Sequence, residues 1–466
     1  MTPRFGRLTL VAGVGVLIWL LPQPDGVDPR AWRLLAIFVA TVLGVIVKPL
    51  PMGAMAVVGI AATVATRTLT IGEALSGFAN ATVWLVVAAF FLAAGFIKTG
   101  LGARIAYVLV TAFGRSTIGL GYSLVAADFV LAPLIPSNTA RAGGVIFPVL
   151  QSLSRVVFGA ESEGCARTRA FLTLAAYNGT VITSAMFITA MVANPLVVRL
   201  AADQGVPITW GQWALAAAVP GAVSLAVVPV VIYWLCATGS DATGDAPHAA
   251  AVALAQLGPV KRTERLVAAV SVVLLGAWIA GSSIGIDTTA AALIAVAALL
   301  VAGVLSWDDL TRDQEAWNTF VWFASLVTMA TYLGQFGLTA WFTNEVRSVV
   351  GGIGWIAGFL GVVFVYFYSH YFFASNTAHV SAMYAPFLAV ALALGTPPLL
   401  AALALGFSSN LFASLTHYGT APAPILFGSG NVSLGAWWKV GAIVSVVNIA
   451  IWVGIGAAWW RLLGLW

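Results

Sequence analysis

Long apolar stretches with very few charges run along the whole chain. Residues 74–97, 266–286, 288–307 and 316–344 contain no Asp, Glu, Lys or Arg, and residues 348–438 form a charge-free stretch of 91 residues. A helix of about 20 apolar residues is long enough to cross the hydrocarbon core of a bilayer. The pattern therefore predicts an all-α polytopic membrane protein.

The composition supports this fold class and excludes several functions. Of the 466 residues, 61% are hydrophobic and 8% are charged, whereas a soluble domain has roughly 25% charged residues. The two cysteines, Cys165 and Cys236, predict neither a disulfide framework nor a cysteine metal site. The net charge of +5 is thinly spread and gives no nucleic-acid signature. The lipid bilayer is the expected partner, and neither a cofactor nor a metal is expected.

One sequence pattern occurs twice, 238 residues apart. Ser137-Asn138-Thr139 recurs as Ser375-Asn376-Thr377, and the same offset links Asn80 with Asn318 and Trp84 with Trp322. Gly100-Leu101 recurs as Gly337-Leu338 at an offset of 237. Internal duplication of this length is typical of transporters whose substrate site forms between two repeats. We predict a first helix and first inverted repeat over 1–237, a polar connector over 238–265, and a second repeat over 266–466.

The repeated Ser-Asn-Thr motifs carry the candidate chemistry. Pro133 and Pro136 precede the first copy and interrupt helical hydrogen bonding, while Ser, Asn and Thr are strong amino-terminal caps. The free N–H groups and positive dipole end of such a half-helix bind anions. Broken backbone at membrane depth is tolerated only inside protein or beside a water-filled cavity. Both motifs are therefore predicted to form the tips of re-entrant hairpins, at 137–139 and 375–377, that meet near the midplane.

Arg141 and His379 follow the two motifs at the same position. An ionised side chain at the centre of a membrane helix costs about 2.5–3.5 kcal/mol, so each should face a cavity or a partner. Either they compensate the charge of a bound anion, or Arg141 pairs structurally with Asp128. His370 is expected to be a core or interface histidine.

A further candidate pair is Gly179-Thr180 and Gly419-Thr420, at an offset of 240. These residues predict a second pair of helix breaks beside the substrate site. Kinks that ease helix packing are the alternative.

These motifs resemble the divalent anion/sodium symporter family. Gly114 to Tyr122, Pro136 to Gly144, Ser369 to Tyr371 and Leu415 to Thr420 look most like its plastid 2-oxoglutarate/malate translocator branch and the bacterial relatives of that branch. The resemblance covers nearly the whole chain. It implies an elevator-type homodimer with about eleven spanning helices, two re-entrant hairpins and dicarboxylate bound by the paired motifs.

That implication puts substrate binding on Ser137, Asn138, Thr139, Ser375, Asn376 and Thr377. It also implies a bacterial-type inner membrane, in which Arg4 and Arg7, preceding the first helix, favour a cytoplasmic amino terminus.

One segment departs from the sodium-coupled members of that family. They carry a Gly-Thr-Pro-Pro-Asn type segment after each hairpin, whereas this chain has Thr189 to Pro195 and Gly419 to Pro424. We therefore expect sodium-independent exchange of C4/C5 dicarboxylates by an antiporter rather than an enzyme. The open alternatives are a sodium- or proton-coupled symporter of di- or tricarboxylates or sulfate, and, from a different class, an intramembrane enzyme. The enzyme is disfavoured because no cluster of His, Asp and Glu with catalytic or metal spacing occurs.

Overall fold

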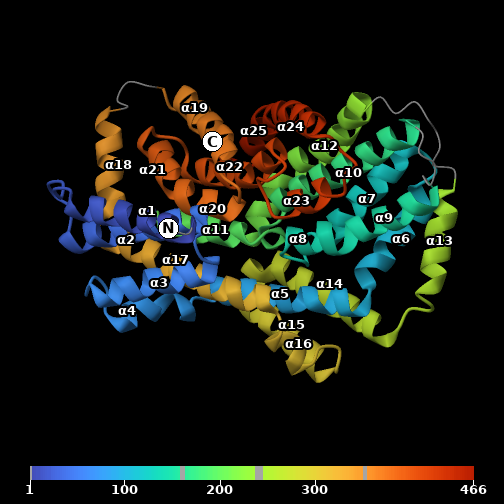
Figure 1. Ribbon diagram of the computed structural model, residues 1–466, viewed down its shortest axis with the longest axis horizontal. Helices are drawn as coiled ribbons and strands as arrows, with labels where there is room; N and C mark the ends of the chain where they lie inside the picture. The colour runs from blue at the N-terminus through green and yellow to red at the C-terminus, as the bar shows by residue number, and fades with distance from the viewer. Residues whose placement is uncertain (1–2, 158–162, 237–244, 350–353) are drawn as a thin grey trace.

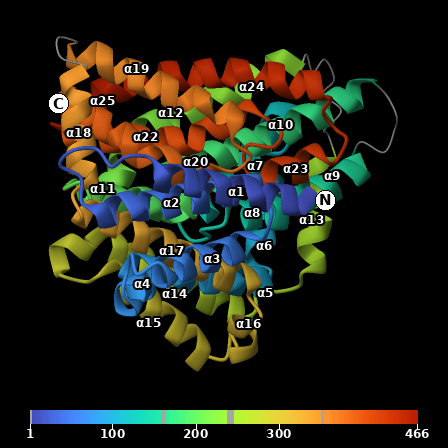
Figure 2. The same ribbon diagram turned by 60° about the vertical axis from the view of Figure 1, so that its left-hand side comes forward.

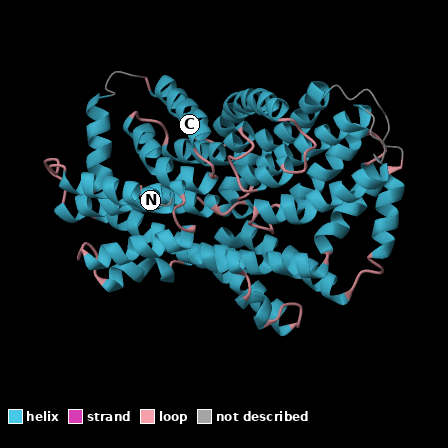
Figure 3. Cartoon of the chain, in the orientation of Figure 1, coloured by secondary structure: helices cyan, strands magenta, loops and turns pink. Residues whose placement is uncertain are grey.

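In a computed structural model, the structure describes residues 3–157, 163–236, 245–349 and 354–466, and all regular structure in these ranges is helical (Figure 3). Seven helices there are long and apolar enough to cross a membrane, or eight if a pair bent by 66° counts as one span. The predicted fold class, an all-α polytopic membrane protein, is confirmed. Four further apolar helices have only 10–17 residues, so long helices alone do not reach the roughly eleven spans that the resemblance implied.

Most of the long helices lie in two layers, which both ribbon views separate (Figures 1 and 2). The lower layer contains α3 (Met52–Ala65), α4 (Ile71–Leu75), α5 (Ala81–Thr99), α14 (Arg262–Ile284), α15 (Thr288–Val301), α16 (Trp307–Thr311) and α17 (Gln314–Gln335). The upper layer contains α7 (Thr117–Leu131), α10 (Glu163–Met186), α12 (Trp210–Cys236), α19 (Trp355–Tyr368), α22 (Pro398–Leu411), α24 (Leu434–Ile449) and α25 (Gly456–Leu462). Within the lower layer α17 packs against α3 and α5, and within the upper layer α10 packs against α7, α12 and α22.

The remaining helices connect or flank these layers. They are α1 (Pro3–Leu20), α2 (Pro29–Val47), α6 (Leu101–Phe113), α8 (Asn138–Arg141), α9 (Phe147–Val157), α11 (Ala193–Ala202), α13 (Ala246–Gln256), α18 (Leu338–Val349), α20 (Asn376–His379), α21 (Ala385–Ala393) and α23 (Pro422–Phe427). Short 3₁₀ segments occur at Ser76–Ala79, Ile188–Ala190, Ser369–Phe372 and Phe412–Leu415, and π segments at Ala142–Ile146, Val380–Tyr384 and Ala450–Ile455.

The two halves of the chain share local structure as well as sequence. Helix α5 ends at Gly100, with φ of 78°, and α6 begins at the next residue. Helix α17 is followed by Gly337, with φ of 81°, and α18 begins at the next residue. Glycine adopts positive φ without steric cost, which explains why this residue recurs at both corners. The shared corner supports the proposed division into two repeats.

Both Ser-Asn-Thr motifs lie where one helix has stopped and another begins. Ser137 caps α8 by accepting a hydrogen bond from the N–H of Ala140 at 3.1 Å, and Ser375 caps α20 by accepting one from the N–H of Ala378 at 3.4 Å. In each copy four α-helical residues are followed by five residues of π-helix, and the helix then continues as α9 or α21. The predicted break and cap are confirmed at both sites.

The predicted polar connector between the repeats contains a helix. Within residues 245–265, α13 packs against α6 and α9. Alanine is the strongest helix former, and the run Ala249-Ala250-Ala251 explains the helix despite the polar residues around it. Residues 238–244 of the predicted connector lie outside the described ranges.

Candidate functional site

The two motif tips meet at one cavity of about 190 Å³ between the layers. Its wall is formed by the two tips, by the segments that follow α10 and precede α23, and by the lower-layer helices α3 and α17. The lining residues are Met52, Ser137, Asn138, Thr139, Met191, Val192, Glu315, Asn318, Thr319, Trp322, Ser375, Asn376, Thr377, Thr420 and Ala421. All six motif residues predicted from the sequence are therefore brought to the same cavity.

Two helix starts face this cavity. The first N–H groups of a helix have no partner within the helix, and the positive end of the helix dipole lies there. Here those groups belong to the motif residues after Ser137 and Ser375. The cavity thus offers two separate sets of backbone and hydroxyl donors, which is an arrangement suited to a ligand with two anionic groups.

The two motif asparagines have different free atoms. Asn138 donates from Nδ2 to Oγ1 of Thr420 at 3.3 Å. Asn376 is 4% exposed and donates from Nδ2 to the carbonyl oxygen of Ser409 at 3.1 Å and to Sδ of Met191 at 3.3 Å, while its Oδ1 has no partner among the described residues. Asn138 therefore retains an N–H for a ligand, whereas the free polar atom of Asn376 is an acceptor.

Only one of the two predicted Gly-Thr pairs lies at the cavity. Thr420 lines it directly after Gly419, but Gly179 and Thr180 lie inside the unbroken helix α10, so the predicted break there is wrong. A Cβ at Gly179 would lie 2.7 Å from Cγ2 of Val125. The glycine thus permits close packing of α10 against α7.

Arg141 lies behind the first tip and is fully buried, and each of its three guanidinium nitrogens has a hydrogen-bond acceptor. Its Nε donates to Oδ1 of Asp128 at 3.2 Å, and its Nη2 donates to Oγ of Ser184 at 2.9 Å. Its Nη1 donates to the carbonyl oxygens of Ile135, at 2.6 Å, and Ala190. The pairing of Arg141 with Asp128 is therefore present, and its guanidinium satisfies carbonyl oxygens that the broken helices leave free.

His379 occupies the matching position behind the second tip. It is fully buried, and its Nδ1 lies 3.0 Å from Nδ1 of His370, whose Nε2 lies 3.0 Å from the carbonyl oxygen of Gly419. The rings of His379 and Phe412 stack with centroids 4.4 Å apart. One histidine must donate and the other accept across the 3.0 Å contact. His370, expected to be a core or interface histidine, is fully buried and also connects His379 to the segment that carries Thr420.

Comparison with known proteins assigns the chain to a family. The transmembrane-region model of the sodium:sulfate symporters matches residues 3–466. The chain belongs to the sodium:sulfate symporter family. The resemblance that the sequence motifs indicated is thereby confirmed, and the protein is a membrane transporter rather than an enzyme.

Individual relatives of this symporter-family chain match over nearly its whole length. It is 52% identical over 461 residues to the putative malate transporter YflS of Bacillus subtilis (strain 168), covering 98% of this chain and 96% of that protein. It is 47% identical over 456 residues to the chloroplastic dicarboxylate transporter 1 of Spinacia oleracea, covering 97% and 80%. Among solved structures, the Alcanivorax borkumensis YdaH transporter is similar, with a TM-score of 0.56 and 13% sequence identity. The superposition covers 99% of this chain and 97% of the YdaH chain. That likeness shows the shared fold alone.

Sequence reasoning missed Glu315, the one carboxylate among the cavity-lining residues of this symporter-family chain. Ser137 donates from Oγ to Oε1 of Glu315 at 3.2 Å, which joins the first tip to α17. Glu315, Asn318, Thr319 and Trp322 all line the cavity, and their spacing of i, i+3, i+4 and i+7 places them on one helix face. That spacing, together with the repeat of Trp84 as Trp322, is the sequence signal from which the contribution of α17 to the cavity could have been predicted.

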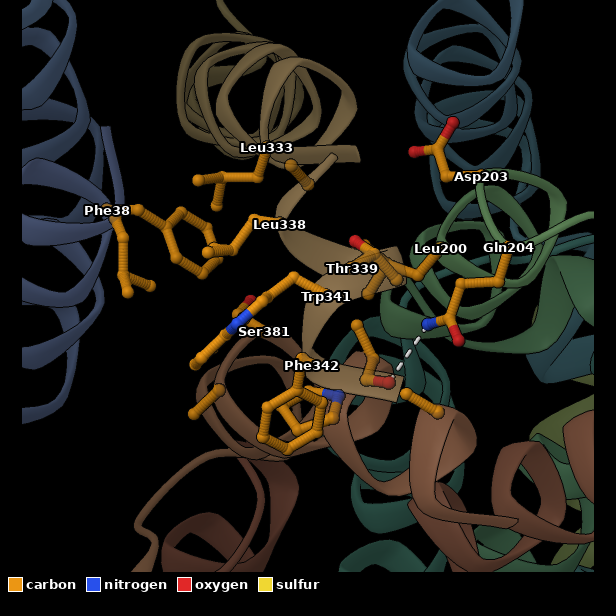
Figure 4. Close-up of a pocket in the computed structure, with 16 residues that line it drawn as sticks. Phe38, Leu200, Asp203, Gln204, Leu333, Leu338, Thr339, Trp341, Phe342 and Ser381 are labelled. Carbon is orange, nitrogen blue, oxygen red and sulfur yellow. Dashed lines mark hydrogen bonds between the residues drawn. The ribbon is translucent and has the colours of Figure 1, made fainter. Parts of the chain in front are cut away.

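A second crevice of about 270 Å³ is larger but chemically different (Figure 4). It lies between α2, α11, α17, α18 and α21, and Phe38, Leu333, Leu338 and Phe342 face into it. Gln204 donates a hydrogen bond from Nε2 to the carbonyl oxygen of Ala385 at 2.9 Å. Most of the residues that line this crevice are apolar, so the smaller polar cavity is the better candidate for a dianion site.

Breaking the Arg141–Asp128 pair tests its structural role. Asp128→Asn leaves a buried guanidinium without its counter-charge, and such a loss costs about 3–5 kcal/mol. We expect a clear fall in the temperature of unfolding in detergent. The double variant Asp128→Leu/Arg141→Met should recover part of that loss, because it removes the unpaired buried charge. The carbonyl oxygens of Ile135 and Ala190, which Arg141 binds in the wild type, then lose their donor, so the recovery is incomplete.

Asp308→Asn is the matched control, since Asp308 pairs with Arg312 on the surface, where their side chains are 69% and 81% exposed. Its stability should be that of the wild type. An equal loss in the single and double variants would contradict the account.

Proposed function

We propose that this transporter exchanges C4/C5 dicarboxylates, of the malate, 2-oxoglutarate and succinate class, across the membrane. The observation that carries the proposal is the meeting of two capped helix starts at one cavity, so that each carboxylate of the substrate can bind one tip. The printed names of the relatives, a putative malate transporter and a dicarboxylate transporter, agree with this substrate class.

The roles of the lining residues follow from their free atoms. Ser137, Asn138 and Thr139 would bind one carboxylate, and Ser375, Thr377 and Thr420 the other. Asn376 would orient the second tip through Ser409 and present an acceptor to a hydroxyl or other donor of the substrate. Reversible binding by uncharged donors fits a carrier that must also release its substrate.

Sodium independence is supported by what occupies the broken backbone. In sodium-coupled carriers, unwound carbonyl oxygens coordinate the ion. In this chain Arg141 donates to the carbonyl oxygens of Ile135 and Ala190, and His370 contacts that of Gly419. We infer that Arg141, together with His379 acting through His370, takes the place of coupling ions.

The wider assembly is proposed on the same basis. The cavity lies between the two layers, so sliding of the upper layer past the lower one, an elevator movement, would expose it alternately to the two sides. The lower layer would then form the fixed scaffold of a homodimer. We also propose a bacterial-type inner membrane, with two re-entrant hairpins and a cytoplasmic amino terminus.

Purified protein in liposomes tests exchange directly. With internal malate, uptake of labelled malate should be fast, and it should be slow without internal substrate. A sodium gradient should change neither rate. Sodium- or proton-driven net uptake that is indifferent to internal malate would contradict exchange and favour a coupled symporter.

Replacing Asn138 and replacing Asn376 should affect substrate affinity and protein stability differently. Asn138→Ala removes one donor to a charged group, a loss of roughly ten- to hundredfold in apparent affinity. It should change the unfolding temperature less than Asn376→Ala, because the protein bond that it loses, to Thr420, is the longer one at 3.3 Å. Asn376→Ala should lower both affinity and stability, because it also removes the bond to Ser409. Asn431→Ala is the control, since that amide donates to Oγ1 of Thr173 outside the cavity. A wild-type apparent KM for Asn138→Ala would show the site assignment to be wrong.

Cross-linking tests the sliding movement. Helix α11 packs against α22 of the upper layer, and its Arg199 donates to Oγ1 of Thr331 of α17 in the lower layer at 3.0 Å. A cysteine pair at these positions should therefore cross-link in the state described here and stop transport. Bound dicarboxylate should slow the cross-linking if the layers slide during turnover. The same cross-linking rate under all substrate conditions would indicate a fixed pore.

A further inference from the structure

Glu315 has the wrong charge for the wall of a dicarboxylate site. The site binds a dianion under the proposed function, on which this inference rests, and a like charge in the same cavity would repel it. Glu73 and Glu264 each pair with an arginine, at 2.9 Å and 2.5 Å. Across the described part of the chain, no cation lies within ion-pair distance of Glu315. Its carboxylate therefore needs another explanation.

The contact of Glu315 with Ser137 supplies one. The Ser137 hydroxyl accepts from the N–H of Ala140 and donates its only hydrogen to Oε1 of Glu315, at 3.2 Å. A hydroxyl has one hydrogen to donate, so Ser137 cannot bind Glu315 and a substrate carboxylate through that hydrogen at the same time. The two carboxylates must compete for the first tip.

We propose that Glu315 is a latch that holds the empty carrier in place. Without substrate, its carboxylate occupies the position of the substrate carboxylate at Ser137 and ties the first tip to α17 of the lower layer. A bound dicarboxylate takes over the Ser137 hydroxyl and repels Glu315, which releases the tip from α17. Glu315 is thus a positioning residue that makes movement of the carrier depend on occupancy.

The latch gives exchange a physical cause. An empty carrier that stays tied to α17 cannot return across the membrane, so each outward substrate must be replaced by an inward one. Removing the latch should convert part of the exchange into net flux, without any change in the groups that bind the second tip.

Efflux from malate-loaded liposomes measures this. For each variant, efflux is compared with and without external malate, and the ratio of the two rates is the readout. Glu315→Ala should lower this ratio about tenfold, the worth of one hydrogen bond to a charged acceptor. Glu315→Gln keeps an acceptor for Ser137 and should give an intermediate ratio. Asp308→Ala removes an exposed carboxylate of the same layer and should keep the wild-type ratio. A wild-type ratio in Glu315→Ala would overturn the latch.

Hydrogen exchange of the tip provides a readout that needs no transport. Backbone amides of 137–141 should exchange about tenfold faster in Glu315→Ala than in the wild type when no substrate is present, and saturating malate should protect both proteins equally. Equal exchange of the two empty proteins would overturn the proposal even if the variant transports nothing. If the wild type moves no dicarboxylate, the proposed function fails, and the comparison of empty proteins still decides whether Glu315 holds the tip.

Discussion

A helix that breaks inside a membrane protein leaves backbone N–H and carbonyl groups that no water in the hydrocarbon region can satisfy. This constraint governs the centre of the molecule. The carbonyl oxygens behind the first tip are bound by Arg141, and the carbonyl oxygen of Gly419 is contacted by His370. The first N–H groups of each tip, which have no partner within the helix, belong to residues that line the cavity. The carbonyl oxygens at the breaks are thus bound by side chains, whereas the N–H groups at the helix starts remain for the anion that we propose as substrate.

Charge balance limits what the buried cations can do. A positive site that is uncompensated when empty would explain exchange without any further device. Arg141, however, has a full counter-charge in Asp128, both completely buried, so it cannot by itself hold the empty carrier back. The contact between Ser137 and Glu315 fills this gap, because it disappears only when another carboxylate takes its place. Binding and movement are then coupled through one hydroxyl.

The sequence was sufficient wherever the information was local or repeated. Two prolines and a capping serine determine the break at Ser137, and the 238-residue offset transferred it to Ser375, where no proline occurs. It failed where a contact joins distant segments. Glu315 lies 178 residues from Ser137 in the sequence. Gly179-Thr180 repeats the residues of Gly419-Thr420 but not their structure. A glycine can mark either a helix break or a close helix contact, and Gly179 lies at a close contact of α10 with α7. The helix in the connector was missed because polar flanks obscured an alanine run.

The position of a bound dicarboxylate is the most direct test of the whole account. Bromosuccinate carries two carboxylates and a bromine that can be located by anomalous scattering in crystals of the protein. We predict a bromine peak in the cavity between Ser137-Asn138-Thr139 and Ser375-Asn376-Thr377, with one carboxylate on each tip and Glu315 no longer bonded to Ser137. A peak in the apolar crevice between α17, α18 and α21, with the tip cavity empty at saturating ligand, would contradict it.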